Sequence, residues 1–417
     1  MSRADKKSDG PVLVLGAHRD ALAALEGTGR RIVNVVNAGH VTEVRKMAQH
    51  STVLGCASDS SAEAVLASLQ RHGYPPNSFA AVCSMKEQAL VTASIIARIV
   101  DARGLPLETA ISLRDKYLQK SAVRQAGVLV ADCSVLEDVG ELEECEIPLV
   151  IKPIAGGGSR LTALIRNQRD RRRFLSEVPQ SERGPWLVEQ VIDGAELHAD
   201  GIVRSGVIVT MTVSRYLSNV IKVHEGALVG SVIEPRNEAA ELYERALRLC
   251  SQSLAALRHH DGIFHLEMFE QPDGALIFSE CAGRLGGGAI LNVVRYQEGI
   301  DLAVEWAHSS LGLPATAEMS AVRRRDGTTG FCLLQTPVGV AKRVPELGPS
   351  AKWPGYVEGE VTLKPGMIMK ASTDASDIRA GSVVIHARAP SGVSRQLRAV
   401  ADWFRQSLIY EDPERRH

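Results

Sequence analysis

The sequence predicts a multidomain protein of mixed α/β and α+β class: a doubly wound parallel sheet at the N-terminus, an α+β middle part and a strand-rich C-terminal lobe. Its 417 residues are too many for a single hydrophobic core of ordinary size, so the length indicates two or three domains. Over about the first hundred residues, short apolar runs alternate with helical patterns, as in repeated βαβ units. From about residue 128, strand pairs joined by glycine-containing turns replace that alternation.

Four apolar runs define the strands of the N-terminal part, which we place at residues 1–112. They are "PVLVLGA", "IVNVVNAG", "STVLGC" and "AAVCS", with helical patterns such as "SSAEAVLASLQRHG" between them. The first strand is followed by "GAHRDALAAL", which holds a single glycine. The G-x-G-x-x-G fingerprint of a dinucleotide site is therefore absent.

A helical pattern through Leu113, Tyr117, Leu118 and Val123, ended by Gly127, opens the middle part, residues 113–314. Three strand pairs that flank glycine turns follow: "PLVIKP" with "RLTALI", "WLVEQVI" with "ELHADGIV", and "GIFHLEMFE" with "ALIFSE". The C-terminal lobe, residues 315–417, is richer in Gly and Pro and is closed by an amphipathic helix near "SRQLRAVADWFRQSL".

Composition excludes several classes of protein. A net charge of −1 gives no field that would mark a nucleic-acid or membrane-surface binder, and the basic run "RNQRDRRR" contains no aromatic residue that could stack on a base. The 7 cysteines are scattered without zinc-site spacing. No signal-peptide run and no 18-residue apolar segment is visible, so we expect a cytoplasmic protein without nucleic-acid or membrane partners.

Two glutamates lie on the last predicted strand pair. If Asp273-Gly274 is a two-residue type I′ turn, Glu267 lies directly opposite Glu280, with Cβ atoms about 4.5–5.5 Å apart. Two carboxylates at that distance repel each other unless a cation lies between them, and oxygen-only ligands suit Mg²⁺. A three-residue loop that includes Pro272 would instead slip the pairing by one and leave the carboxylates diagonal. Two solvent-facing acids at strand ends are the structural alternative.

The segment "VIKPIAGGGSRL" is a second candidate site. A strand presents Lys152, and a loop of small residues follows: Gly156, Gly157, Gly158 and Ser159. Glycines let backbone N–H groups turn toward an anion, and the ammonium adds charge, so the segment suits a polyphosphate covered by a hairpin lid. A Walker loop is excluded, and a structural turn is an equal alternative. Beyond it, Glu189 and Glu196 bracket a turn where a purine and a ribose could bind.

In their order along the chain, these segments resemble the ATP-grasp superfamily. The resemblance covers roughly residues 110–300 and rests on Lys116 in "RDKYLQK", Lys152 with "AGGGS", "VEQVIDGAE", "HLE" and "SECAGRLGG". It implies the ATP-grasp fold, with the N-terminal α/β part as the pre-ATP-grasp domain and a glycine-rich lid over about residues 128–195.

The resemblance implies a role for each matching residue. ATP phosphates would contact Lys116 and Lys152 under the closing loop 156–159. The adenine would lie beside Glu189 and the backbone of Val191, and the ribose beside Glu196. The metal ion, Mg²⁺ with Mn²⁺ as the alternative, would be held by the two carboxylates described above, Glu267 and Glu280.

The residues that meet the substrates follow from the same resemblance. Arg284, together with Lys152, would clamp the transferred phosphoryl group, because a planar guanidinium binds oxygens in pairs. His265 alternates onto the face of Glu267 and is assigned to substrate contact or to accepting the amine proton, with a hydrogen-bonded structural histidine as the alternative. The candidate substrate contacts are Arg215, Tyr216 and Gly287.

One departure from the family pattern indicates which branch of the superfamily the sequence resembles. Many ATP-grasp enzymes have E-x-N at the second metal strand, whereas this sequence reads Glu280-Cys281-Ala282, which is similar to the L-amino-acid ligase (dipeptide synthetase) branch. That resemblance implies an ATP-dependent carboxylate–amine ligase, which forms an amide or peptide bond through an acyl phosphate and acts on small-molecule carboxylate and amine substrates. The alternatives are a biotin-carboxylase-like or purine-pathway enzyme and a non-catalytic ATP-binding protein; a homodimer is left open.

Overall fold

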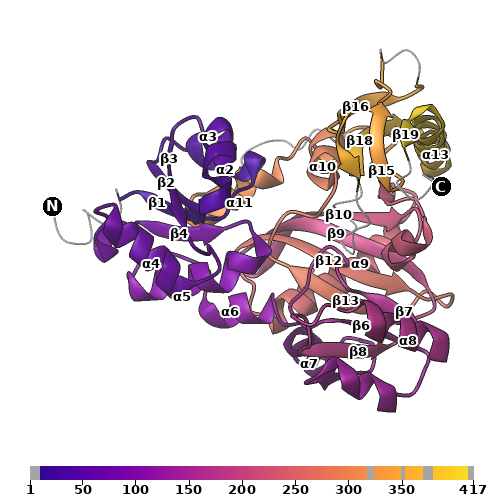
Figure 1. Cartoon of the computed structure of the whole chain (residues 1–417), viewed down its shortest axis with the longest axis horizontal. Helices are drawn as coiled ribbons and strands as arrows, with labels where there is room; N and C mark the ends of the chain where they lie inside the picture. Colours follow the sequence, from indigo (N-terminus) through magenta and orange to yellow (C-terminus); the bar gives the residue numbers. More distant parts are fainter. Residues whose placement is uncertain (1–9, 317–323, 349–352, 370–378, 412–417) are drawn as a thin grey trace.

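The N-terminal part of the chain folds into the parallel sheet that its apolar runs predict (Figure 1). The computed structural model describes residues 10–316, 324–348, 353–369 and 379–411. The strands pair in the order β3-β2-β1-β4, all parallel. Their bounds are Val12–Leu15 for β1, Ile32–Asn37 for β2, Ser51–Cys56 for β3 and Ala81–Ser84 for β4.

Helices cover both faces of this sheet, which is the doubly wound arrangement. One face packs against α2 (Arg19–Glu26), α3 (Val41–Met47) and the later helix α11 (Leu302–Leu311). The other face packs against α4 (Ala62–Arg71) and α5 (Leu90–Ile99). A short helix, α6 (Leu107–Ser112), leads out of this part.

A small antiparallel sheet in the order β5-β8-β6-β7 forms the predicted lid region. Its strands are Cys133–Leu136 (β5), Leu149–Pro153 (β6), Ala163–Ile165 (β7) and Trp186–Gln190 (β8). The predicted hairpin of β6 and β7 is present, with Leu149 opposite Ile165. Helix α8 (Gln168–Glu177) covers the sheet, and Phe174 meets Trp186 edge to face.

An eight-stranded sheet in the order β13-β12-β9-β10-β11-β14-β18-β16 forms the centre of the molecule. The bounds of these strands are Ala195–Arg204 (β9), Val207–Tyr216 (β10), Gly230–Ile233 (β11), Gly262–Glu270 (β12), Leu276–Ala282 (β13), Thr328–Gln335 (β14), Tyr356–Val361 (β16) and Arg379–Ala387 (β18). Helix α9 (Ala240–Ala256) packs on one face, and α10 (Ile290–Glu298) and α11 pack on the other.

The strands of the C-terminal third extend this central sheet, because β14 pairs with β11. A three-stranded sheet in the order β17-β15-β19 and helix α13 (Pro390–Ser407) lie beside it. Those strands are Gly339–Arg343 (β15), Ile368–Met369 (β17) and Ile409–Glu411 (β19). Among the described residues, no helix has the length and apolar character needed to span a bilayer.

Two sequence predictions about local structure are wrong. The segments "WLVEQVI" and "ELHADGIV" do not form a hairpin: β8 pairs with β5 and β6, whereas β9 pairs with β10 and β12. Asp193-Gly194 therefore joins two sheets. The predicted helix through Leu113 is interrupted, and α7 (Lys116–Gln125) begins anew after Asp115, whose carboxylate accepts from the N–H groups of Tyr117 and Leu118.

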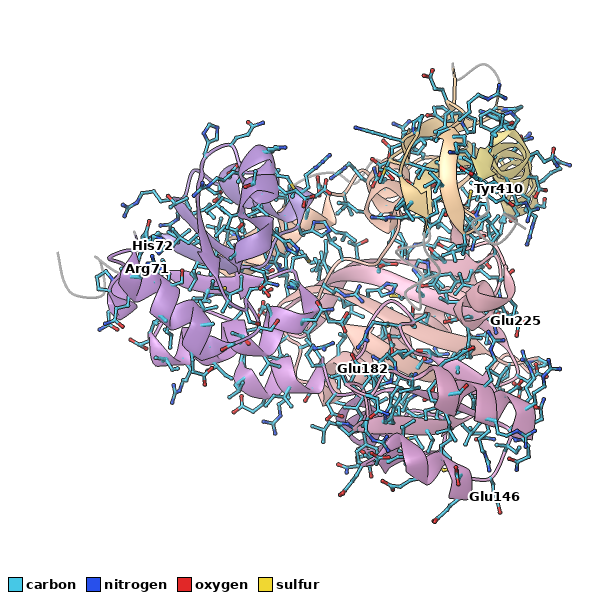
Figure 2. All side chains as sticks on the ribbon, viewed as in Figure 1. Arg71, His72, Glu146, Glu182, Glu225 and Tyr410 are labelled. Atoms are coloured by element: carbon cyan, nitrogen blue, oxygen red, sulfur yellow. The ribbon has the colours of Figure 1, made fainter. Side chains whose placement is uncertain are left out.

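The lid sheet also contacts the central part at its surface. Arg166, just before α8, lies 2.5 Å from the carboxylate of Glu225, which is labelled in Figure 2. Both side chains are about half exposed, so this ion pair adds little stability.

Candidate active site

The two predicted metal ligands face each other. Glu267 on β12 is directly opposite Glu280 on β13, as predicted. The turn between these strands is not the predicted one, because Gln271 pairs with Ala275 around the three-residue loop Pro272–Gly274. This three-residue loop is the alternative considered from the sequence. Alone, it would shift the pairing by one residue and leave the two carboxylates diagonal.

A β-bulge in β13 restores the register. Met268 is opposite Phe278 and Glu267 is opposite Glu280, so Ser279 is the extra residue between the two pairings. The two carboxylates thereby stand on the same face of adjacent strands. Two carboxylates with oxygen ligands only are a donor set that fits Mg²⁺, which completes its shell with water and phosphate oxygens.

Lysine side chains gather around Glu280. The Nζ of Lys116, the first residue of α7, lies 3.1 Å from Glu280 Oε2, and Lys152 Nζ lies 3.9 Å from the same oxygen. Burial alone would raise the pKa of Glu280, but these ammonium groups lower it to about 2. Glu280 is therefore ionised at neutral pH and available to a cation.

A third, buried lysine belongs to this cluster and was missed by the sequence analysis. Glu189 on β8 lies between Lys152, at 2.7 Å, and Lys120 on α7, at 3.0 Å. Burial opposes the charge of Glu189, yet the two lysines lower its pKa to about 2, and the pKa of Lys152 is raised above its usual range. The Glu189 carboxylate thus holds the two lysines in place.

These residues line a first cavity of about 490 Å³ between the lid sheet and the central sheet. Its charged end is the lysine cluster, and its apolar walls include Val150 and Leu164 of the lid and Phe269 and Phe278 of the central sheet. Predicted residues that line it are Lys116, Lys152, Gly156, Gly157, Ser159, Glu189, Val191, Glu196, Glu267 and Glu280. The cavity has the concave, mixed apolar and cationic character of a nucleotide site.

The loop 156–159 connects β6 to β7 at the mouth of this cavity. The carbonyl of Gly156 accepts from Lys116 Nζ at 2.8 Å, and Gly158 and Ser159 have φ of 64° and 57°. At the other end, Glu196 accepts from the N–H of Val220 at 2.6 Å. Burial, followed by the nearby carboxylate of Glu267, raises the pKa of Glu196 to about 8.

A second cavity, of about 330 Å³, lies on the other side of the two acids. It shares Gly157, Ser159, Val220, Glu267 and Glu280 with the first. The remaining predicted residues in its wall are Gly158, Tyr216, His265, Arg284 and Gly287. Both cavities thus meet at the proposed metal ligands.

The N-terminal part contributes Glu87, a residue that no motif in the sequence singles out. Glu87 accepts from Arg284 Nε at 2.7 Å and from Arg114 at 2.6 Å. Burial would raise the pKa of Glu87, but Arg284, Lys116 and Arg114 hold it below its usual range. Glu87 therefore fixes Arg284 at the wall of the second cavity, across the junction of two parts of the chain.

His265 lies between two carboxylates. Its Nδ1 lies 2.9 Å from Asp200, its Nε2 lies 3.4 Å from Glu267, and these carboxylates, outweighing burial, raise its pKa to about 10. A protonated imidazole with both N–H groups facing carboxylates has no lone pair to accept a proton. This arrangement favours the alternative of a hydrogen-bonded structural histidine: His265 holds Glu267, which also accepts from Tyr216 OH at 2.9 Å.

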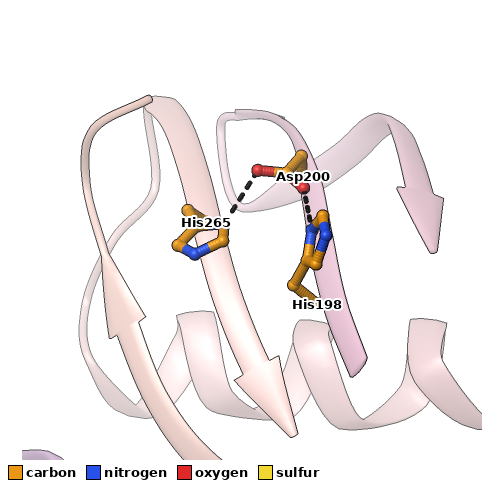
Figure 3. Close-up of side chains that lie close together, drawn as sticks. All are labelled: His198, Asp200 and His265. Carbon is orange, nitrogen blue, oxygen red and sulfur yellow. Dashed lines mark hydrogen bonds and ion pairs between the residues drawn. The ribbon is translucent and has the colours of Figure 1, made fainter. Parts of the chain in front are cut away.

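Asp200 joins two histidines in the interior of the sheet (Figure 3). One of its oxygens faces His265, and the other lies 2.5 Å from His198 Nδ1. His198 Nε2 is in turn 2.8 Å from Ser231. Each imidazole faces a different oxygen of Asp200, and the ligand atoms of the three side chains all lie within 4.8 Å of one another, held by these hydrogen bonds.

Arg215 does not reach the site. Neighbouring residues of a strand point to opposite faces, so Tyr216 faces the second cavity while Arg215 points away from it. Its guanidinium is held by Glu234 at 2.5 Å and by Glu270 at 2.7 Å. Its predicted role as a substrate contact is wrong.

Known proteins resemble this chain in sequence and in fold. A sequence model of the ATP-grasp domain matches residues 121–287. The L-arginine-specific L-amino acid ligase of Bacillus subtilis is 25% identical over 305 residues, which are 71% of this chain and 72% of that protein.

Two solved structures have the same fold. The L-amino acid ligase of Bacillus licheniformis superposes with a TM-score of 0.80 at 17% identity, covering 97% of this chain and 99% of that chain. The phosphoribosylglycinamide synthetase of Anaerococcus prevotii superposes with a TM-score of 0.68 at 16% identity, covering 96% and 100%. The predicted fold is confirmed.

Proposed function

This chain carries an ATP-grasp domain, and from that premise we propose that it is an ATP-dependent ligase that joins a carboxylate to an amine, with amino acids or amino-acid-like molecules as substrates. One observation supports the proposal above the others: Glu267 and Glu280 lie in the wall common to both cavities. A nucleotide in the first cavity and a carboxylate in the second would meet there. The named Bacillus subtilis relative supports amino acids as substrates.

Lys116 and Lys152 would bind the phosphates of ATP. Both ammonium groups lie beside Glu280 at the end of the first cavity that borders the second. Mg²⁺ held by Glu267 and Glu280 would neutralise charge on the phosphate oxygens. The purine would occupy the apolar part of the cavity, near Val191 and Phe269.

Arg284 would orient the substrate carboxylate in the second cavity. A carboxylate oxygen attacks the terminal phosphorus of ATP, the bond to the bridging oxygen breaks, and ADP leaves. The amine then attacks the acyl carbon, and phosphate leaves to give the amide. The fixed cations favour this sequence because negative charge develops on the transferred phosphoryl group.

The proposal is tested by ADP release with ATP, Mg²⁺ and pairs drawn from the proteinogenic amino acids, with mass spectrometry of the product. We expect ADP release that depends on an amino acid and a product whose mass is that of the two amino acids less one water. Absence of ADP release with every pair would contradict the proposal. ADP release that requires bicarbonate would instead indicate a carboxylase.

A further inference from the structure

The wall of the second cavity contains both charged and apolar side chains. Its charged groups include those of the proposed reaction, Glu267, Glu280 and Arg284. Its apolar part, which we call the apolar end, consists of Phe331 and Leu333 of β14, Ile290 of α10, and Val229, whose carbonyl accepts from the N–H of Leu333 at 2.8 Å. A wall of this mixed character offers charged groups to a reacting group and an apolar surface to a side chain.

The apolar end is built by β14 and the glycine run before α10. Phe331 and Leu333 alternate along β14 and are 2% and 4% exposed. Gly288 has φ of 66°, and a Cβ atom there would lie 2.5 Å from the ring of Phe331. Gly288 therefore lets the backbone lie directly on the aromatic ring, which fixes this wall of the cavity.

We propose that this end binds the side chain of the carboxylate substrate and selects an uncharged aliphatic or thioether side chain, such as that of valine, leucine, isoleucine or methionine. The inference rests on the proposed function. With the carboxylate at Arg284, the rest of the substrate would extend along the same cavity, whose wall includes Phe331 and Leu333.

A basic side chain would find no counter-charge at the apolar end. Among the described residues, the acids that line this cavity are Glu87, Glu267 and Glu280, and none of them belongs to the apolar end. Glu87 is already bound by two arginines, and the other two face the metal position. A guanidinium at the apolar end would lose its hydration without gaining a partner, so this chain differs in preference from the relative named for arginine.

Specificity for the carboxylate substrate can be measured separately from the amine by using hydroxylamine, which converts the acyl phosphate to a hydroxamate and releases phosphate. We expect kcat/KM for leucine or methionine to exceed that for alanine by about 10- to 100-fold. Arginine and lysine are expected to react at least about 100-fold more slowly than leucine.

Two variants and a control locate the preference. A Cβ added at Gly287 meets nothing within 4 Å, so Gly287→Ala should fold normally and reduce kcat/KM for leucine more than for alanine. Leu333→Glu should shift the preference toward lysine and arginine. Cys332→Ala, on the same strand but packed in the core on the other side of the sheet, should leave the leucine-to-alanine ratio unchanged.

The outcomes separate the two proposals. Hydroxamate formation with arginine or glutamate preferred over leucine would overturn the inference and leave the ligase proposal intact. An unchanged leucine-to-alanine ratio in Gly287→Ala would also overturn it. No ADP or hydroxamate with any donor would contradict the proposed function itself and this inference with it.

Discussion

Replacing Glu189 by glutamine removes the buried carboxylate that lies between Lys120 and Lys152 while keeping the size of the side chain. Lowering the pKa of this carboxyl from 4.5 to about 2 corresponds to about 3 kcal/mol of stability, at 1.36 kcal/mol for each tenfold change in proton affinity. Breaking a buried ion pair from one side costs about 3–5 kcal/mol, which agrees. We therefore expect Glu189→Gln to lose about 3 kcal/mol at pH 7.

The sign of the pH dependence follows from the lowered pKa of Glu189. A carboxylate whose pKa is lower in the folded state stabilises the protein fully above its unfolded pKa of about 4.5. This stabilisation is lost as the pH falls toward about 2. The difference in unfolding free energy between the wild type and Glu189→Gln should therefore be constant from pH 7 to 5 and shrink below about pH 4.5.

Urea and thermal unfolding measure this difference. For a domain of about 200 residues, 3 kcal/mol lowers Tm by roughly 6–12 °C. The matched control is Glu182→Gln, in the same lid region, since the Arg160–Glu182 ion pair is about one-third exposed and is expected to contribute less than about 1 kcal/mol. Equal stability of Glu189→Gln and the wild type at pH 7, or a difference that does not change on acidification, would refute the reasoning.

Two further predictions concern the proposed reaction. Glu280→Gln should lower kcat by at least about 100-fold and raise the Mg²⁺ concentration needed for half-maximal rate. Both quantities are measured by ADP release at varied Mg²⁺. An unchanged dependence on Mg²⁺ would contradict the assignment of Glu280 as a metal ligand. Lys152→Met should weaken ATP binding or turnover by on the order of 100-fold. The control is Lys342→Met, because the ion pair of Lys342 with Glu411 lies in the C-terminal sheet. ATP binding equal to that of the wild type would contradict the assignment of Lys152 to the phosphate site.

The opposition of Glu267 and Glu280 was predicted correctly from a turn that does not form. The three-residue loop at Pro272–Gly274 and the bulge at Ser279 each shift the pairing by one residue, and the two shifts cancel. Local turn propensity could not reveal the bulge, because a bulge depends on what packs along the outer edge of β13. There, the side-chain amide of Gln119 on α7 bonds both backbone groups of Cys281.

The polar face of α7 explains why Lys120 was missed. Tyr117 and Leu118, two residues of the apolar pattern that predicted this helix, are 37% and 43% exposed. The buried residues instead include Lys116, Gln119 and Lys120, because this face meets the acids of the site. Hydrophobic periodicity fails where a helix buries charges that pair with partners elsewhere in the chain.

Other site residues differ in whether the sequence could have identified them. Glu196, His198 and Asp200 alternate along "ELHAD" on a strand whose neighbouring residues are apolar, so their common inward face could have been recognised. Glu87 could not, because it meets Arg284 only through the packing of the N-terminal part on the central sheet. The hairpin of β8 and β9 was predicted wrongly for the same reason, since strand pairing depends on tertiary contacts. β8 pairs with β5 and β6, and β9 pairs with β10 and β12.

The transfer of ¹⁸O from a labelled substrate carboxylate tests the central claim most directly. If the carboxylate attacks the terminal phosphorus of ATP and an amine then displaces phosphate, one ¹⁸O per amide formed appears in inorganic phosphate. We expect this label in phosphate, together with one ADP per product. Unlabelled phosphate, or label in AMP with release of pyrophosphate, would contradict an acyl phosphate formed between the two cavities.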